Sequence, residues 1–71
     1  MMTDEPIRDY DITEAMITYG GGFVSGLGRL YRQADPENQR RLKRSFTMYF
    51  EEYAEMVRRR RQVRREAWGD P

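Results

Sequence analysis

The sequence predicts an all-α protein, folded either as a helical hairpin or as an arrangement of three helices. Apolar residues recur three or four positions apart along two long segments, which is the spacing of one helix face. A helix start signal precedes each segment. No run of residues alternates between apolar and polar side chains, as a half-buried strand would. The 71 residues are enough for a single small domain, which we expect over residues 11–66.

Both ends of the chain are expected to lie outside this domain. Residues 1–10 have no periodicity and hold Pro6 among acidic residues, so we expect a flexible acidic leader. At the other end, Gly69 and Pro71 end any helix, and residues 67–71 are expected to form a flexible tail.

The first helix is predicted over residues 12–33. Asp11 and Glu14 occupy the N-cap and N3 positions of a capping box, where each side chain can accept a hydrogen bond from a free backbone N–H. The apolar positions that follow are Ile12, Met16, Tyr19, Phe23, Leu27, Leu30 and Ala34. Because their spacing passes through the glycines without a change of phase, it predicts one continuous helix with a glycine-rich face.

The second start signal is the segment Asp-Pro-Glu at residues 35–37, with an N-cap acid, a proline at the first helical position and an acid in the first turn. No glycine or proline interrupts residues 37–68, which allows one helix of about 30 residues. Thr47 is the candidate break, because a threonine can cap a new helix. The alternatives are therefore one long arm or two helices over residues 36–46 and 48–66.

Five of the six glycines fall within residues 20–28. Each costs a helix interior roughly 0.8–1 kcal/mol relative to alanine, or on the order of 4–5 kcal/mol in total. We therefore expect a compensating contact, in which another backbone or an aromatic ring lies against Gly22 and Gly26. The predicted groove consists of Tyr19, Gly22, Phe23, Gly26, Leu27 and Leu30. Gly20 and Gly28 are expected to accept alanine if they face solvent.

Three occupants of this groove are open: the chain's own second arm, a second copy or foreign partner, and a phosphate group. Known phosphate-binding motifs do not fit. Gly21 and Gly26 have the spacing of a P-loop, but Leu27 and Gly28 follow in place of Lys and Ser or Thr. A dinucleotide-binding motif would need a glycine in place of Ser25.

A second candidate surface is basic. The net charge of the chain is +1, but residues 1–35 carry −3 and residues 36–71 carry +4, so the two halves can attract each other within one chain or between two. The arginines that could bind nucleic-acid phosphates or an acidic protein are Arg40, Arg41, Arg44, Arg58, Arg59, Arg60, Arg61, Arg64 and Arg65. Consecutive arginines spread around a helix, so a solvated helix end is the remaining interpretation.

The chain has no cysteine and no histidine. It therefore lacks thiol nucleophiles, disulfides and the side chain most used as a general base and zinc ligand. Glu51 and Glu55 share a helix face, and without histidine we interpret them as a solvated surface. We expect no enzymatic activity, no cofactor and no metal. No apolar run approaches the roughly 20 residues of a membrane span, so we expect no membrane contact and a cytoplasmic location.

Residues 12–53 resemble a group of small proteins encoded in tailed phages and prophages. The resemblance rests on the segments Glu14-Ala15-Met16, Tyr19-Gly20-Gly21, Phe23-Val24 and Ala34-Asp35, with Leu27, Asn38, Leu42, Phe46 and Tyr53. Such proteins often carry proline in place of Thr47 and serine in place of Gly22. The first substitution implies a helix break at residues 46–48, which favours three helices, and the second implies a tight contact. The resemblance implies a phage origin and attaches no activity to the chain.

A phage protein of this size without catalytic residues is expected to act by binding. The leading hypothesis is a protein that binds a host or phage protein and inhibits a host defence system such as a CRISPR effector. The alternatives are an arginine-rich regulator that binds nucleic acid and a structural homodimer. We expect the chain to form a dimer, because two copies can bury more of the large apolar side chains than one copy can.

Overall fold

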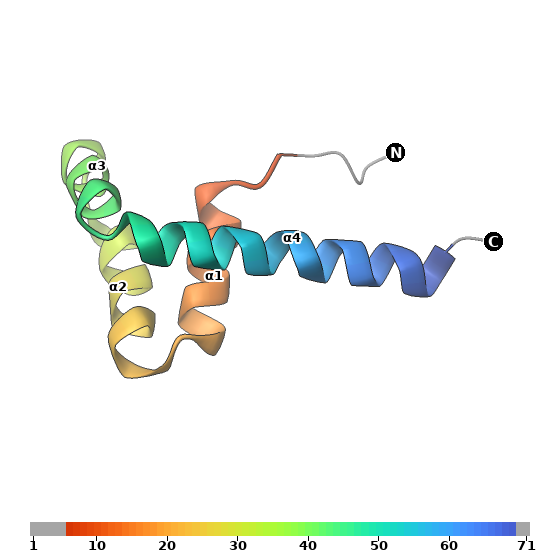
Figure 1. The fold of residues 1–71 in the computed structure, drawn as a ribbon. Helices are drawn as coiled ribbons and strands as arrows, with labels where there is room; N and C mark the ends of the chain where they lie inside the picture. Colours follow the sequence, from red (N-terminus) through yellow and green to blue (C-terminus); the bar gives the residue numbers. More distant parts are fainter. Residues whose placement is uncertain (1–5, 70–71) are drawn as a thin grey trace.

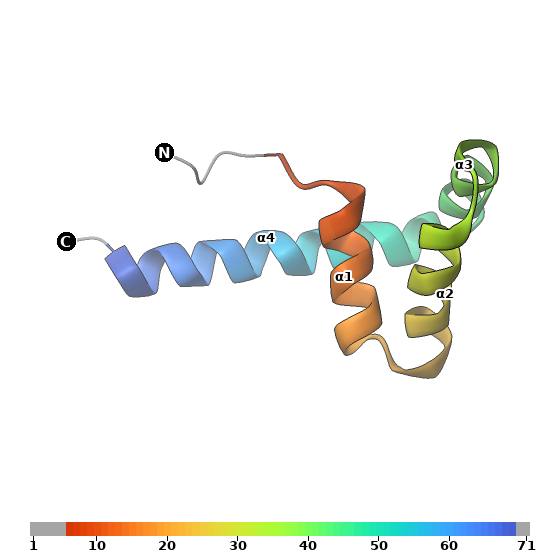
Figure 2. The same cartoon turned by 180° about the vertical axis from the view of Figure 1, so that it is seen from behind.

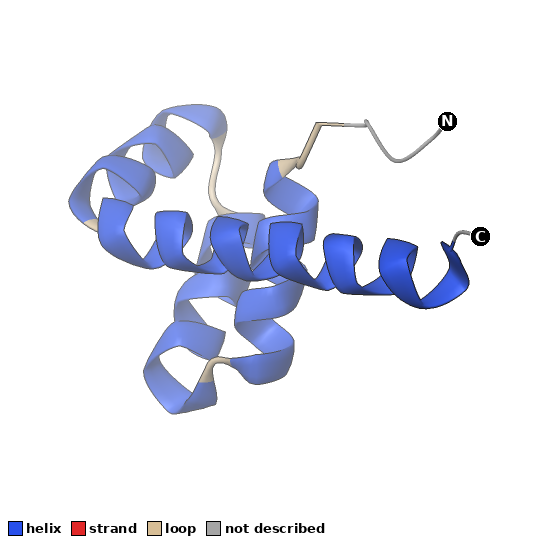
Figure 3. Ribbon diagram, turned by 45° about the vertical axis from the view of Figure 1, so that its right-hand side comes forward, coloured by secondary structure: helices blue, strands red, loops and turns tan. Residues whose placement is uncertain are grey.

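The computed structural model describes residues 6–69, with side chains as far as Arg64, and this part of the chain forms four helices. They are α1 (Asp9–Tyr19), α2 (Gly21–Gln33), α3 (Pro36–Ser45) and α4 (Thr47–Gly69). No strand occurs among the described residues (Figure 3), so the predicted all-α class is confirmed. The predicted leader and tail lie partly outside the described residues, at residues 1–5 and 70–71.

The helices are arranged as a hairpin with a long helix lying across it. α1 and α2 run side by side in opposite directions, and α4 crosses them (Figure 1, Figure 2). α3 follows α2 and returns the chain to the start of α4. The C-terminal half of α4 extends past α1, away from the other helices (Figure 1). The packed part of the molecule is therefore the hairpin, α3 and the first half of α4.

The chain turns at Gly20 and Gly21, so the predicted continuous helix over residues 12–33 is wrong. Gly21 has a φ of +70°, a left-handed conformation that side chains with a Cβ atom rarely adopt. The backbone N–H of Gly20 donates to the carbonyl oxygen of Met16 at 2.9 Å and closes the last turn of α1. Apolar spacing cannot detect this turn, because the residues on each side keep a helical period of their own.

The turn shifts the buried face of α2 by one residue relative to the prediction. Phe23 and Leu30, which were expected to face inward, are exposed. Val24 and Tyr31, each one position later, are buried instead. The buried apolar core consists of Ile12, Ala15, Met16, Val24, Leu27, Tyr31, Phe50 and Tyr53. Phe23 and Leu30 therefore remain on the outer face of α2.

The glycines in close contact are Gly20 and Gly28, which were expected to accept alanine. A Cβ atom at Gly28 would lie 3.1 Å from Cγ1 of Ile17 and 3.2 Å from the carbonyl oxygen of Thr13, both on α1. A Cβ atom at Gly20 would overlap the carbonyl oxygen of Met16. The absence of a side chain at Gly28 therefore lets α2 lie directly against the backbone of α1, and its absence at Gly20 leaves room for the tight turn between them.

Gly22 and Gly26 have open space around them. A Cβ atom at either position would meet no heavy atom of another residue within 4 Å. The prediction that the chain's own second arm covers these glycines is therefore wrong. The ring of Phe50, on the second arm, packs against Tyr31 with 5.1 Å between ring centroids.

A buried threonine and an arginine join the two arms of the hairpin. Thr13 is fully buried, and its hydroxyl bonds to the backbone of its own helix and accepts a hydrogen bond from Nε of Arg32 at 3.0 Å. The same guanidinium donates to Glu14 at 3.1 Å and lies over the ring of Tyr10, 4.1 Å from its centroid. Arg32 therefore satisfies the buried hydroxyl and holds α2 against α1.

Asp9 joins three helices. Its carboxylate accepts hydrogen bonds from the hydroxyl of Tyr31 on α2 and from Nζ of Lys43 on α3, each at 2.7 Å. Burial alone would raise the pKa of Asp9, but the two hydrogen bonds and the charge of Lys43 outweigh it, so this pKa lies below its ordinary value of 3.8. Burial and the hydrogen bond to Asp9 raise the pKa of Tyr31 from 10.0 to about 12.

The start of α1 differs from the prediction. The helix begins at Asp9, with Arg8 as its N-cap residue, whereas the sequence indicated Asp11 as the cap. Asp11 instead occupies the N3 position, where its carboxylate accepts a hydrogen bond from the backbone N–H of Arg8 at 3.1 Å. The capping interaction is of the predicted kind, but it lies three residues earlier in the chain.

The second arm follows its prediction more closely. α3 begins as expected, with Asp35 as the N-cap residue and Pro36 at the first helical position. The predicted break at residues 46–48 is confirmed, because α3 ends at Ser45 and α4 begins at Thr47. The hydroxyl of Thr47 lies 2.9 Å from the carbonyl oxygen of Lys43, so it bonds back to α3 rather than capping α4.

The different surroundings of Gly26 and Gly28 predict opposite effects of substitution. Gly26→Ala should stabilise the protein by about 0.8–1 kcal/mol, because alanine favours helix and meets only solvent. Gly28→Leu should destabilise it by roughly 1–3 kcal/mol or more, because the side chain must displace α1. Thermal unfolding followed by circular dichroism measures both effects. A Gly28→Leu variant that melts at or above the wild-type temperature would contradict the close approach of the two helices.

The contact between Asp9 and Tyr31 predicts a loss of stability in alkali. The folded-state pKa of Tyr31 lies above the unfolded value, so its contribution is complete below pH 10 and is lost as the pH rises towards 12. Tyr31→Phe should therefore be less stable than the wild type at neutral pH, and this difference should shrink between pH 10 and pH 12. Urea unfolding of both proteins measures the difference. A gap that stays constant over this range would show that Tyr31 does not titrate in this way.

Candidate functional site

The outer face of α2 carries large apolar side chains that the fold does not bury. Phe23 is 60% exposed and Leu30 is 51% exposed. Gly26 lies between them on the same helix, about one turn from each. Leu27 belongs to the core, and only 5% of its surface is exposed. The structure thus brings part of the predicted groove together on one outward face and places Leu27 inside.

Aromatic rings from the second arm extend this face. The ring centroid of Phe23 lies 5.8 Å from that of Phe46 and 5.7 Å from that of Tyr49. Phe46 and Tyr49 are themselves 6.3 Å apart. Such edge and tilted arrangements are favourable for aromatic rings. The contacts with Phe46 and Tyr49 therefore hold the ring of Phe23 in place, although Phe23 is exposed. The three rings lie where α2 meets the junction of α3 and α4.

A groove lies between α2 and α3. It has a volume of about 620 Å³ and is lined by Leu30, Gln33, Ala34, Asp35, Asn38, Arg41, Leu42 and Ser45. Leu30 contributes to the groove from α2 and Leu42 contributes from α3. We call this groove, together with the rings of Phe23, Phe46 and Tyr49, the apolar groove.

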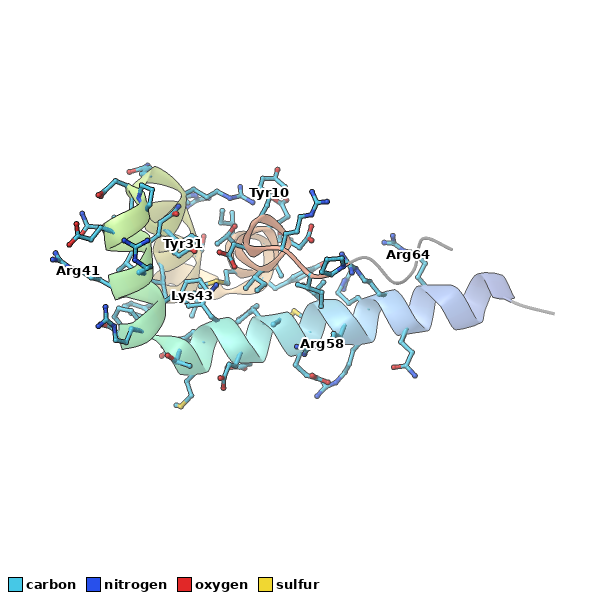
Figure 4. The ribbon with its side chains drawn as sticks, turned by 90° about the horizontal axis from the view of Figure 1, so that it is seen from above. Tyr10, Tyr31, Arg41, Lys43, Arg58 and Arg64 are labelled. Carbon is cyan, nitrogen blue, oxygen red and sulfur yellow. The ribbon has the colours of Figure 1, made fainter. Side chains whose placement is uncertain are left out.

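Exposed arginines occur on both helices that form the apolar groove. Arg29 on α2 and Arg40 and Arg44 on α3 are exposed and make no ion pair within the described part of the chain. Arg41 points outward from α3 (Figure 4) and pairs with Glu37 at 2.9 Å, as predicted from their spacing. The two helices that form the apolar groove therefore carry exposed positive charge, and one acid, Asp35, lines the groove itself.

The arginines of α4 do not form one uniform basic face. Arg58 and Arg59 both pair with Glu55, at 2.9 Å and 3.6 Å. Arg61 pairs with Asp11 of α1 at 3.3 Å. With the bond between Lys43 and Asp9, this ion pair joins the acidic and basic halves of the sequence within one chain, which was one of the two expected arrangements. The side chain of Arg65 lies outside the described residues.

Tyr19 lies apart from the other residues of its predicted groove, between α1 and α4. The guanidinium of Arg60 lies over its ring, 4.8 Å from the centroid. The two residues border a cleft of about 410 Å³ between α1 and α4, lined by Asp11, Glu14, Ala15, Thr18, Tyr19, Val57, Arg60, Arg61 and Arg64. We call this the α1–α4 cleft. The sequence therefore identified residues of two distinct surfaces and merged them into one.

Both surfaces combine apolar side chains with arginines. Among the side chains that the structure describes, as far as Arg64, no group of three or more carboxylates is arranged to hold a metal ion. Every buried side-chain nitrogen or oxygen in that range has a hydrogen-bond partner. No helix in the described range is both long and apolar enough to cross a membrane. What the described chain offers is an apolar groove with arginines around it and a separate cleft lined by arginines.

Sequence reasoning missed part of the apolar groove. Leu42, Phe46 and Tyr49 were not among the predicted groove residues, yet all three are partly exposed beside α2. Their position became clear only from the turn at Gly21, which rotates Phe23 and Leu30 outward.

Comparisons of the chain with protein-family models, with curated proteins and with solved structures find no match. Function is therefore inferred from the geometry of these two surfaces.

Proposed function

We propose that this chain is a non-enzymatic, phage-encoded binding protein, and that its apolar groove holds a helix of a host or phage protein. The observation that carries the proposal is the exposure of Phe23 and Leu30 beside a groove of about 620 Å³. Exposed apolar side chains gathered in one place mark interaction sites on small proteins. A groove between two helices can hold the apolar face of a third helix.

The charges around the groove indicate the chemistry of the partner. Arg29 on α2 and Arg40 and Arg44 on α3 are exposed on the helices that form it, without an ion pair in the described chain. An amphipathic helix with acidic residues beside its apolar face would meet both features at once. Acidic groups on the partner would also speed association, and that effect would weaken as salt increases.

Within this class, we propose a component of a host defence system, such as a CRISPR effector, as the target. The support comes from the resemblance of residues 12–53 to small phage and prophage proteins, and from the absence of histidine and cysteine from the chain. A small protein with few catalytic groups can still inhibit a larger one by occupying a surface that the larger protein needs.

A second copy of the chain is the other candidate occupant, because the chain carries charges of both signs beside the groove. α3 carries Arg40, Arg41 and Arg44, whereas the first turns of α4 carry Glu51 and Glu52, and the apolar groove adjoins both helices. A two-fold interface requires such self-complementarity, because each charged patch must meet its opposite on the other copy. Sedimentation equilibrium over a range of concentrations distinguishes the two occupants, since a groove filled by a second copy gives a dimer.

The binding proposal is tested by placing an aspartate in the groove and, as a control, outside it. Phe23→Asp should abolish capture of the partner by a tagged protein in infected or lysogenic cells, because a charge would be buried against an apolar face. Val63→Asp is the matched control, because Val63 is 63% exposed, close to the 60% of Phe23, and lies on the projecting part of α4. The control should capture the partner as the wild type does.

The outcomes separate the parts of this proposal. Equal capture by both variants and the wild type would exclude the apolar groove as the binding site. Capture that depends on Phe23, but of a protein with no role in defence, would support the groove and contradict the proposed target. A dimer that Phe23→Asp dissociates, without any foreign protein captured, would assign the groove to a second copy.

A further inference from the structure

We propose that the α1–α4 cleft binds single-stranded nucleic acid, with Arg60 stacking on a base and Arg64 binding a backbone phosphate. This proposal concerns a different face of the molecule from the apolar groove and does not depend on the function proposed for that groove. It rests on three observations: the position of Arg60, the pattern of ion pairs among the arginines, and the shape of the cleft.

Arg60 is held in the position that a stacking residue needs. Its guanidinium lies over the ring of Tyr19, 4.8 Å from the centroid, in a cation–π contact. The side chain is nevertheless exposed, so the guanidinium can still be approached by a ligand. Arginine planes and aromatic rings are the groups on which proteins stack unpaired bases. Tyr19 therefore supports Arg60 from α1, and a base can add to the stack.

The ion pairs around the cleft leave a specific part of its positive charge uncompensated. Arg61 is paired with Asp11, and the other acid of the cleft, Glu14, is paired with Arg32. Arg64 has no ion pair among the described residues, and it extends from α4 on the side where α1 lies (Figure 4). It stands one helical turn after Arg60 on the same face. A phosphate beside the stacked base would therefore meet Arg64.

The shape of the cleft favours a strand over a small anion. The cleft has a volume of about 410 Å³, and Ala15 and Val57 give it apolar lining against which a sugar or base can lie. A second hollow of about 380 Å³, lined by Arg59, Arg60, Val63 and Arg64, shares two of its arginines. The two hollows therefore meet at Arg60 and Arg64, which suits successive nucleotides of one strand.

A duplex fits this surface less well. Reading a duplex groove requires a helix that presents an uninterrupted basic face, whereas Arg58 and Arg59 are paired with Glu55 beside the cleft. Bases in a duplex are already stacked on one another, so Arg60 would gain nothing from them. We therefore expect unpaired RNA or DNA to bind better than the corresponding duplex.

The experiment measures fluorescence anisotropy with labelled oligouridylate and oligothymidylate of about 12 nucleotides. Arg60→Gln and Arg64→Gln should each weaken binding roughly tenfold or more. Arg58→Gln is the matched control, because it removes the same charge from the same helix but away from the cleft, and it should weaken binding much less. Arg64→Gln should also reduce the slope of log affinity against log salt by about 0.7, the value for one phosphate contact on a single strand.

Substitution by lysine separates stacking from charge. Arg64→Lys keeps a cation for the phosphate and should retain most of the affinity, whereas Arg60→Lys keeps the charge, loses the planar group and should not. Circular dichroism of each variant confirms that it is folded. Equal losses for the three glutamine variants, wild-type binding by Arg60→Lys, tighter binding to duplex, or no binding at low salt would each overturn the proposal.

Discussion

The structure depends on the direct contact between α1 and α2 at Gly28. No side chain separates the two helices there, and even one added carbon would lie 3.1 Å from Ile17 and 3.2 Å from the backbone of Thr13. This approach places the fully buried Thr13 within reach of Arg32, and it brings Tyr31 within 2.7 Å of Asp9. α4 then lies across the hairpin, with Phe50 packed against Tyr31. The glycines weaken each helix as an isolated segment, and the packing between the helices offsets that weakness.

The same constraint leaves apolar surface outside the core. α4 crosses the hairpin of α1 and α2 on one side, and the buried core lies between them on that side. Phe23 and Leu30 lie on the opposite side of α2, where α3 and the start of α4 border them without covering them. A chain of 71 residues has no further element in its described part to close this groove. Our protein-binding proposal follows from this geometry.

The sequence predicted the fold class, the start of α3 and the break before α4, because capping residues, proline and helical spacing act locally. It did not predict the hairpin. The turn depends on a positive φ at Gly21, and three consecutive glycines do not indicate which of them adopts it. Because this turn was missed, Phe23 was predicted to be buried in place of Val24. Close contact was likewise predicted at Gly22 and Gly26, whereas it occurs at Gly20 and Gly28. The candidate residues Phe23 and Leu30 were identified for a groove on the wrong side of the helix, and Tyr19 was grouped with them although it lies under Arg60.

The hairpin is the central claim, because both proposed surfaces exist only if the chain turns at Gly21. The chain has no cysteine, so spin labels can be placed at two sites alone, through Arg8→Cys and Gln33→Cys, both on exposed residues. In a continuous helix over residues 8–33 these sites would be about 38 Å apart, at a rise of about 1.5 Å per residue. In the structure, Arg32 lies 3.2 Å from the carbonyl oxygen of Tyr10, so the two labelled ends of the hairpin are neighbours. Pulsed electron paramagnetic resonance should therefore give a distance far shorter than that of the continuous helix, and a distribution centred near the length of the continuous helix would contradict the account.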